Sequence, residues 1–114
     1  MIKNRSSAPH YTWGQVCDGW RLLDGLDLGV IQERIPPGAG EVRHRHHHAR
    51  QLFFVLEGQL QLRFDEAVVD LQAGDAFEVA PLQFHQARNV AERDVLFLVI
   101  SAPSTRGDRE EDVG

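Results

Sequence analysis

The sequence predicts an all-β domain, built as a sandwich or a small barrel of short strands. Apolar and polar residues alternate with a period of two in several segments, which is the spacing of a strand with one buried face. Glycine, proline and aspartate interrupt the chain between these segments. Apolar residues at helical spacing over more than about ten residues are scarce. Many short strands within 114 residues are typical of one small all-β domain.

The first two predicted strands lie at residues 30–35 and 42–48. The first is a β-branched stretch that ends at the Pro-Pro-Gly turn at 36–38. The second alternates histidine with arginine or histidine, so His44 and His46 share one face and His48 joins them if the strand continues.

The next two predicted strands form a hairpin. Residues 52–56 are apolar on both faces and end at Glu57-Gly58, and residues 60–64 alternate apolar and polar side chains. We therefore expect these strands to pair, with one face of the second strand in solvent. Turn residues then separate three more predicted strands, at 68–71, 76–80 and 95–100. Their inward aromatic and β-branched residues are the expected core.

The two ends of the chain differ from this pattern. Tyr11 and Trp13 begin a glycine-containing aromatic stretch, so residues 1–29 are predicted to pack on the barrel formed by residues 30–103. Residues 104–114 contain four acidic and two basic residues and almost no apolar side chain. This composition predicts a flexible acidic tail.

Composition and charge exclude several classes of protein. Seventeen acidic against twelve basic residues give a formal charge of −5, which disfavours nucleic acid and anionic lipid as partners. The longest apolar runs are far shorter than the ~20 residues of a membrane span. The first residues lack the apolar core of a secretory signal, and Cys17 is the only cysteine, expected to be an inert buried thiol. These features predict a cytoplasmic protein.

Histidine is the residue most informative about function. His44 and His46 are two residues apart on a predicted strand, so both imidazoles can face one metal ion. Zinc and neighbouring divalent transition metals bind imidazole nitrogen well. A histidine-rich tract can also be a solvated patch or an adventitious chelator, and the tract alone leaves both alternatives open. His47 and His48 are further candidates of this kind.

Two longer spacings resemble the two sequence motifs of the cupin family: Gly38-x5-His44-x-His46-x4-Gln51-x6-Gly58 and Gly74-x10-His85-x3-Asn89. With the segment between them they span most of the domain. The chain is most similar to small single-domain, RmlC-like cupins, some of them labelled mannose-6-phosphate isomerase-like. This resemblance implies a double-stranded β-helix, or jelly-roll, barrel. It also implies that one divalent transition metal (Zn, Ni, Fe, Mn, Co or Cu) is bound inside the barrel by His44, His46, Gln51 and His85.

Two positions depart from the family pattern. Leu82 stands where the second motif usually has glycine, and Pro81 is displaced by one position, which predicts a local change of turn. Gln51 stands where glutamate is usual, and its amide can ligate a metal but adds no negative charge. An ion bound by neutral ligands polarises a substrate strongly and favours an anionic ligand. Alternatively, Gln51 marks a degenerate site that binds metal weakly or not at all.

Two functions of different classes follow from the resemblance. The first is a metal-dependent isomerase, lyase or dioxygenase acting on a small, oxygen-rich, anionic substrate such as a sugar acid. No carboxylate stands at a spacing that identifies its general acid or base. The second is a non-catalytic cupin that binds a metal or small molecule as a sensor or storage module.

Two further expectations concern ligands and assembly. Arginine can grip a carboxylate with two hydrogen bonds, so Arg34, Arg50 and Arg88 are candidate anion clamps. A small barrel must also cover the edges of its sheets, and small cupins commonly pair. A homodimer is therefore expected.

Overall fold

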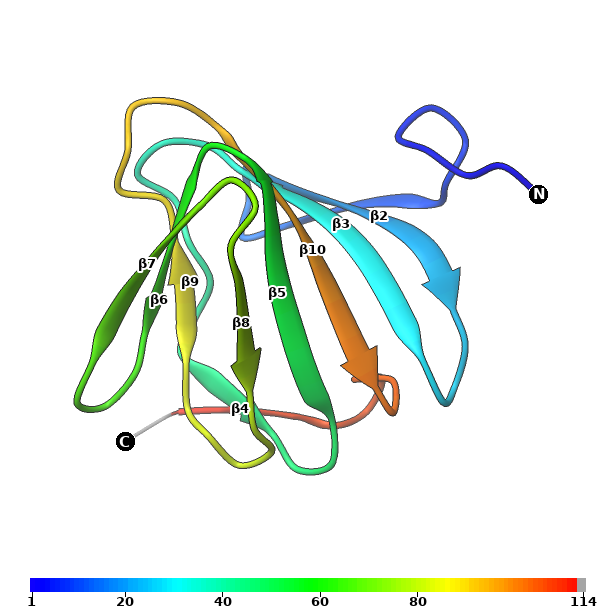
Figure 1. Cartoon of the computed structure of the whole chain (residues 1–114). Helices are drawn as coiled ribbons and strands as arrows, with labels where there is room; N and C mark the ends of the chain where they lie inside the picture. Colours follow the sequence, from blue (N-terminus) through cyan, green and yellow to red (C-terminus); the bar gives the residue numbers. More distant parts are fainter. Residues whose placement is uncertain (113–114) are drawn as a thin grey trace.

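A computed structural model describes residues 1–112, which form eleven strands and no helix (Figure 1). The strands are β1 His10–Trp13, β2 Cys17–Asp24, β3 Gly29–Ile35, β4 His44–His46, β5 Arg50–Glu57, β6 Gln59–Arg63, β7 Val68–Gln72, β8 Ala76–Val79, β9 Gln86–Arg88, β10 Val95–Ala102 and β11 Arg109–Glu111. The predicted all-β class is thus confirmed. Nowhere in this described part of the chain is there a helix with the length and apolarity needed to cross a membrane.

The strands form two facing layers. One is a six-stranded antiparallel sheet in the order β1-β2-β3-β10-β5-β8. The other contains the sheet β7-β6-β9 and the pair β11-β4, which a bridge between His44 and His85 links. Figure 1 shows β6, β7 and β9 facing β5, β8 and β10 across the interior.

The core lies between these layers because alternate residues of each strand point inward. Phe97 and Val55 are completely buried, and the Phe53 ring lies 6.1 Å from the Phe97 ring. The buried apolar cluster is Cys17, Ile35, Phe53, Val55, Leu60, Leu62, Leu71, Val79, Ala87, Val95, Phe97 and Val99. The interior also holds buried polar residues: His44, His46, Gln51, His85, Asn89 and Ser101.

The predicted hairpin between residues 52–56 and 60–64 is wrong. β5 pairs with β10 and β8, whereas β6 pairs with β7 and β9. Gly58 stands at the corner where the chain passes from one layer to the other, with φ +85°, and an added Cβ would lie 2.5 Å from the Asp94 carbonyl oxygen. Only glycine fits this corner. Since β5 has a partner along both edges, it has no free edge for β6.

The N-terminal residues extend the large sheet. β2 pairs with β3, and β1 pairs with β2, so that Tyr11 stands opposite Gly19. An added Cβ at Gly19 would lie 2.3 Å from the Tyr11 ring. Glycine at this position therefore leaves room for the Tyr11 ring over the backbone of β2.

The C-terminal segment differs from the flexible tail predicted for residues 104–114. β11 pairs with β4, and Asp108 accepts hydrogen bonds from the backbone N–H groups of His47, His48 and Ala49 at 2.9–3.1 Å. The segment buries no apolar core of its own, so composition alone suggested disorder. Hydrogen bonds and ion pairs to the β4 region hold it instead, including Arg45–Glu110. Residues 113 and 114 lie outside the described residues.

We expect Asp108→Ala to lower the free energy of unfolding by about 1–3 kcal/mol, because it leaves backbone donors without an acceptor. Partial burial raises the pKa of the Asp108 carboxyl, but the backbone N–H donors outweigh it and the pKa lies below its ordinary value. This contribution is therefore present above about pH 4 and lost as the pH falls through the lowered pKa. Urea denaturation at pH 7 measures the change. The exposed Glu111→Ala is the control, and an equal effect from both would contradict the prediction.

Candidate metal centre

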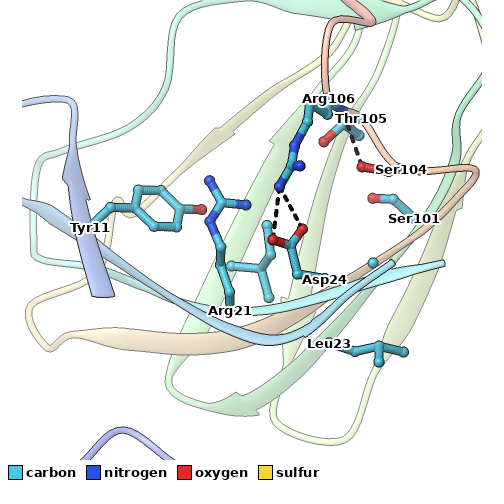
Figure 2. A pocket seen from close by; sticks show the side chains of 10 residues that line it. Tyr11, Arg21, Leu23, Asp24, Ser101, Ser104, Thr105 and Arg106 are labelled. Carbon is cyan, nitrogen blue, oxygen red and sulfur yellow. Dashed lines mark hydrogen bonds and ion pairs between the residues drawn. The ribbon is translucent and has the colours of Figure 1, made fainter. Parts of the chain in front are cut away.

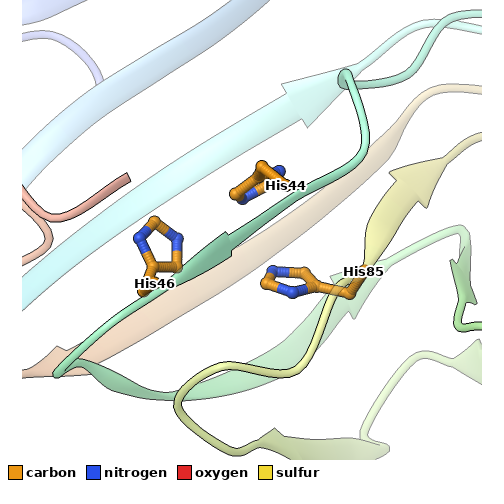
Figure 3. A group of neighbouring side chains, drawn as sticks. All are labelled: His44, His46 and His85. Atoms are coloured by element: carbon orange, nitrogen blue, oxygen red, sulfur yellow. The ribbon is translucent and has the colours of Figure 1, made fainter. Parts of the chain in front are cut away.

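Two histidines of one strand and a third from a distant part of the chain meet in the interior (Figure 3). His44 and His46 project from the same face of β4, and His85 precedes β9. The His44 ring centroid lies 5.0 Å from that of His46 and 4.5 Å from that of His85. One ring nitrogen from each of the three residues lies within 4.8 Å of the others. The structure thus brings together the three predicted histidine ligands.

Burial keeps these imidazoles uncharged. The three residues are only 0–5 % exposed. Burial, together with the charge of neighbouring His85, lowers the pKa of His44 to about 3 and that of His46 to about 4. Burial also lowers the pKa of His85. All three rings are therefore neutral at pH 7, and neutral imidazole is the form that ligates a metal.

Backbone carbonyls set the orientation of two of the rings. His44 Nδ1 lies 2.8 Å from the Val42 carbonyl oxygen, and His85 Nδ1 lies 2.9 Å from that of Gln83. Since a carbonyl oxygen only accepts, Nδ1 of each neutral ring carries the proton and Nε2 keeps its lone pair. This arrangement is typical of metal-ligating histidines.

Gln51 lies on β5 with its side chain buried. Its Nε2 donates a hydrogen bond to Ser101 Oγ at 3.2 Å, whereas its Oε1 is buried and has no partner. Phe53, on the same face of β5, has its ring 5.9 Å from that of His85. Gln51 therefore belongs to the inner face that approaches the histidines. Its role as a metal ligand stays a prediction.

These residues fit a divalent transition metal. His46 Nδ1, His85 Nε2 and Gln51 Oε1 are buried atoms without a hydrogen-bond partner. An unsatisfied buried polar atom is costly. An ion that accepts electron pairs would satisfy such atoms, and imidazole and amide groups suit zinc and its neighbours.

The sequence profile of the cupin domain family matches residues 31–101 of the chain. The chain belongs to the cupin family. The predicted double-stranded β-helix barrel is therefore confirmed, whereas the mannose-6-phosphate isomerase-like subgroup stays a prediction. A protein of Methanocaldococcus jannaschii described as uncharacterized is 22 % identical over 82 residues, which are 72 % of this chain and 66 % of that protein.

Solved structures share the fold of this cupin at low identity. KdgF from Halomonas sp. has a TM-score of 0.82 at 19 % identity, covering 91 % of this chain and 95 % of its own. A sugar phosphate isomerase of the cupin superfamily from Silicibacter pomeroyi has 0.77 at 24 %, covering 91 % and 76 %. A double-stranded β-helix protein from Klebsiella pneumoniae has 0.74 at 24 %, covering 84 % of each chain. At these identities the likeness concerns the fold.

Glu41 is a site residue that sequence reasoning missed. It lies in the loop before β4, with its side chain 11 % exposed and Oε2 4.0 Å from His44 Nε2. Burial raises the pKa of its carboxyl to about 7. Glu41 stands at a variable position of the first cupin motif, so no spacing pointed to it.

Glu41 connects the histidines to a pocket of about 340 Å³ beside β11. Tyr11, Glu33 and Arg109 also line this pocket. Burial, aided by the charge of Glu41, raises the pKa of the Glu33 carboxyl to about 8. Arg109 stands opposite His46 in the β11–β4 pair, which places this arginine near the cluster.

A second pocket of about 160 Å³ adjoins the same C-terminal segment (Figure 2). Tyr11 and Arg21 line one side of it, and Arg106 lines the other. The Arg106 guanidinium is paired with the Asp24 carboxylate at 2.8–2.9 Å. Tyr11 lines both pockets.

The remaining sequence candidates lie elsewhere. β4 ends at His46, shorter than the predicted strand 42–48, so His48 does not continue the inward row. His47 Nε2 contacts Glu110 at the surface. Of the candidate anion clamps, Arg34 is paired with Asp18 and Asp94, Arg50 is paired with Glu78, and Arg88 donates to the Gly38 carbonyl oxygen. Cys17 is fully buried, and burial raises the pKa of its thiol to about 11, as expected for an inert thiol.

Leu82 shows why its cupin motif position usually holds glycine. Its φ is +68°, in the left-handed region, and its N–H donates to the His46 carbonyl oxygen at 2.7 Å. A leucine pays a steric cost there that glycine avoids. The turn beside the metal centre is therefore strained at this residue.

We expect Leu82→Gly to leave stability unchanged or raise it by up to ~1 kcal/mol, although glycine usually destabilises. Half of the Leu82 side chain is exposed, so little burial is lost. Thermal unfolding measures the difference from Leu82→Ala, which loses the same apolar contacts but keeps the strain. A glycine variant less stable than the alanine variant would contradict this reading.

Proposed function

We propose that this cupin is a metal-dependent enzyme that acts on a small, oxygen-rich, anionic substrate such as a sugar acid. The proposed chemistry is that of an isomerase, a lyase or a dioxygenase. The observation that carries it is the buried cluster of His44, His46 and His85, whose ring nitrogens lie within 4.8 Å of one another and whose imidazoles are neutral. Gln51, whose buried Oε1 has no partner, is the proposed fourth ligand.

The absence of charge among these four residues favours an anionic substrate. A divalent ion held by three imidazoles and one amide would act as a Lewis acid with its charge uncompensated by these ligands. Arg109 adds a positive charge on the pocket side. The structurally similar protein from Silicibacter pomeroyi is named a sugar phosphate isomerase, and a sugar phosphate is a substrate of this oxygen-rich, anionic kind.

The pocket residues can bind and orient such a substrate. Arg109 can hold a carboxylate, and the Glu33 and Glu41 carboxyls can exchange hydrogen bonds with hydroxyl groups. The raised pKa of Glu33 keeps a proton at its carboxyl near pH 7. Glu33 is thus suited to give or take a proton in the pocket.

Metal analysis followed by titration with citrate and galacturonate tests this proposal. Untagged protein should contain up to one divalent transition metal per chain, and carboxylates should bind to the metal-loaded form more tightly than to the chelated form. Absence of metal after growth in supplemented medium, together with no uptake on titration, would overturn the proposal.

A non-catalytic binding cupin is the second candidate. The almost complete burial of the three histidines favours it, because a closed site suits storage or sensing. Ligand exchange separates the two functions. An enzyme should bind carboxylates directly at the loaded metal, as seen in the visible spectrum of the Co²⁺ form, whereas a closed binding site should keep that spectrum unchanged.

We also expect this cupin to form a homodimer in solution. β1 and β8 are the edge strands of the large sheet, and unpaired strand edges favour association. Light scattering at micromolar concentration should give twice the chain mass. A monomer mass under these conditions would contradict this expectation.

A further inference from the structure

Backbone and side-chain contacts fix the position of Glu41. Its N–H donates to the Ala87 carbonyl oxygen at 2.9 Å, and its own carbonyl oxygen accepts from Gln86 Nε2 at 2.8 Å. Its carboxylate Oε1 accepts from the Ala87 N–H at 3.0 Å. These three contacts tie Glu41 to β9, directly after the ligand candidate His85. The orientation of its second oxygen, Oε2, is therefore set by the fold.

While Glu41 is ionised and His44 is neutral, Oε2 faces a ring nitrogen that has no proton to donate. It lies 4.0 Å from His44 Nε2. The proton of neutral His44 is on Nδ1, which donates to the Val42 carbonyl oxygen, so Nε2 presents a lone pair. The His44 and Glu41 side chains are 4 % and 11 % exposed, so water screens them little. Oε2 and Nε2 are then both hydrogen-bond acceptors. Their placement opposite each other is favourable when a positive charge lies beside both.

We propose that Glu41 supplies the metal centre with the negative charge that Gln51 does not. This inference rests on the proposed metal site and assigns a charge-compensating role to a residue at a variable position of the first cupin motif. Three imidazoles and one amide carry no charge, and the Glu41 carboxylate, whose side chain is 11 % exposed, stands next to one of those imidazoles. The charge would thus act from beside the ligands, leaving Gln51 neutral. One carboxylate offsets only half of a divalent charge, so a positive charge would remain to attract an anionic substrate.

Moving the charge tests this role. Four full-length variants are compared with the parent for Zn²⁺ affinity by chelator competition at pH 7.5: Glu41→Gln, Gln51→Glu, the double variant with both changes, and Glu78→Gln. Glu41→Gln should bind Zn²⁺ about 10–100-fold more weakly. The double variant should recover most of this loss, because it moves the carboxylate to position 51. Glu78 is an exposed partner of Arg50, so Glu78→Gln should leave the affinity unchanged.

Circular dichroism of Glu41→Gln should match that of the parent, because glutamine can still accept the Ala87 N–H through its Oε1.

A second measurement uses only the parent protein and does not depend on the folding of any variant. In the isotope-labelled parent, binding of Co²⁺ should shift the ¹³C resonance of the Glu41 side-chain carboxyl.

The outcomes separate this inference from the proposed function. Equal Zn²⁺ affinity of Glu41→Gln and the parent would overturn the role of Glu41 while leaving the metal site intact. An unshifted Glu41 carboxyl in a Co²⁺-loaded parent would do the same. A parent that binds neither ion would overturn the proposed function and this inference with it.

Discussion

His85→Ala is expected to abolish stoichiometric metal binding by this cupin. His85 is completely buried, and its ring centroid lies 4.5 Å and 5.9 Å from those of His44 and His46. Its Nε2 has no other partner. Removing one of the few protein ligands of a transition metal removes a bond that no neighbouring group replaces, so we expect affinity to fall more than about 100-fold.

Elemental analysis of the untagged protein measures this loss, with circular dichroism to show that the barrel remains folded. His44→Ala and His46→Ala should behave alike. His47→Ala is the matched control, because that imidazole belongs to the same tract but contacts Glu110 at the surface. Equal metal content in His85→Ala and His47→Ala would show that the metal binds elsewhere.

Gln51 substitutions are expected to change metal and carboxylate binding in opposite directions. Gln51→Glu places a full negative charge on the inner face of β5, where low exposure strengthens Coulomb attraction. We therefore expect tighter binding of a divalent metal, by about tenfold or more. The same charge should weaken the binding of citrate or a sugar acid, since it lowers the Lewis acidity of the ion and repels the ligand.

Gln51→Ala should lose metal affinity and gain nothing in carboxylate binding. Isothermal titration with Zn²⁺, and then with citrate on the loaded protein, measures both effects. If both variants equalled the parent in both titrations, Gln51 would not be a ligand. The site would then consist of three histidines, and the argument for an anionic substrate would lose its main support.

The strands that depend on local pattern were predicted well. Residues 30–35, 60–64 and 95–100 nearly coincide with β3, β6 and β10. Period-two alternation reports which face is buried, and this information is local to each strand. β1, β2, β9 and β11 were not predicted, because they are short or mixed in polarity, and pairing with distant strands stabilises them.

Strand partners and the C-terminal segment could not be predicted in the same way. Residues 52–56 and 60–64 are adjacent in sequence, yet they lie in different layers. Likewise, Asp108 and β11 are held by backbone groups some sixty positions earlier in the chain. The composition of a segment indicates whether it can form an apolar core. It does not indicate whether a loop distant in sequence will hydrogen-bond to that segment.

For the site, the sequence by itself determined that His44 and His46 share a face, because side-chain direction along a strand follows from backbone geometry. The resemblance of the two sequence motifs to those of cupins added the family and His85. Only the tertiary structure decided that these imidazoles are buried and neutral, and that Glu41 and Arg109 stand near them. The physical reason is that burial and Coulomb interactions depend on distance in space. Glu41 owes its position to β9 and Arg109 to β11, and no local pattern specifies either contact.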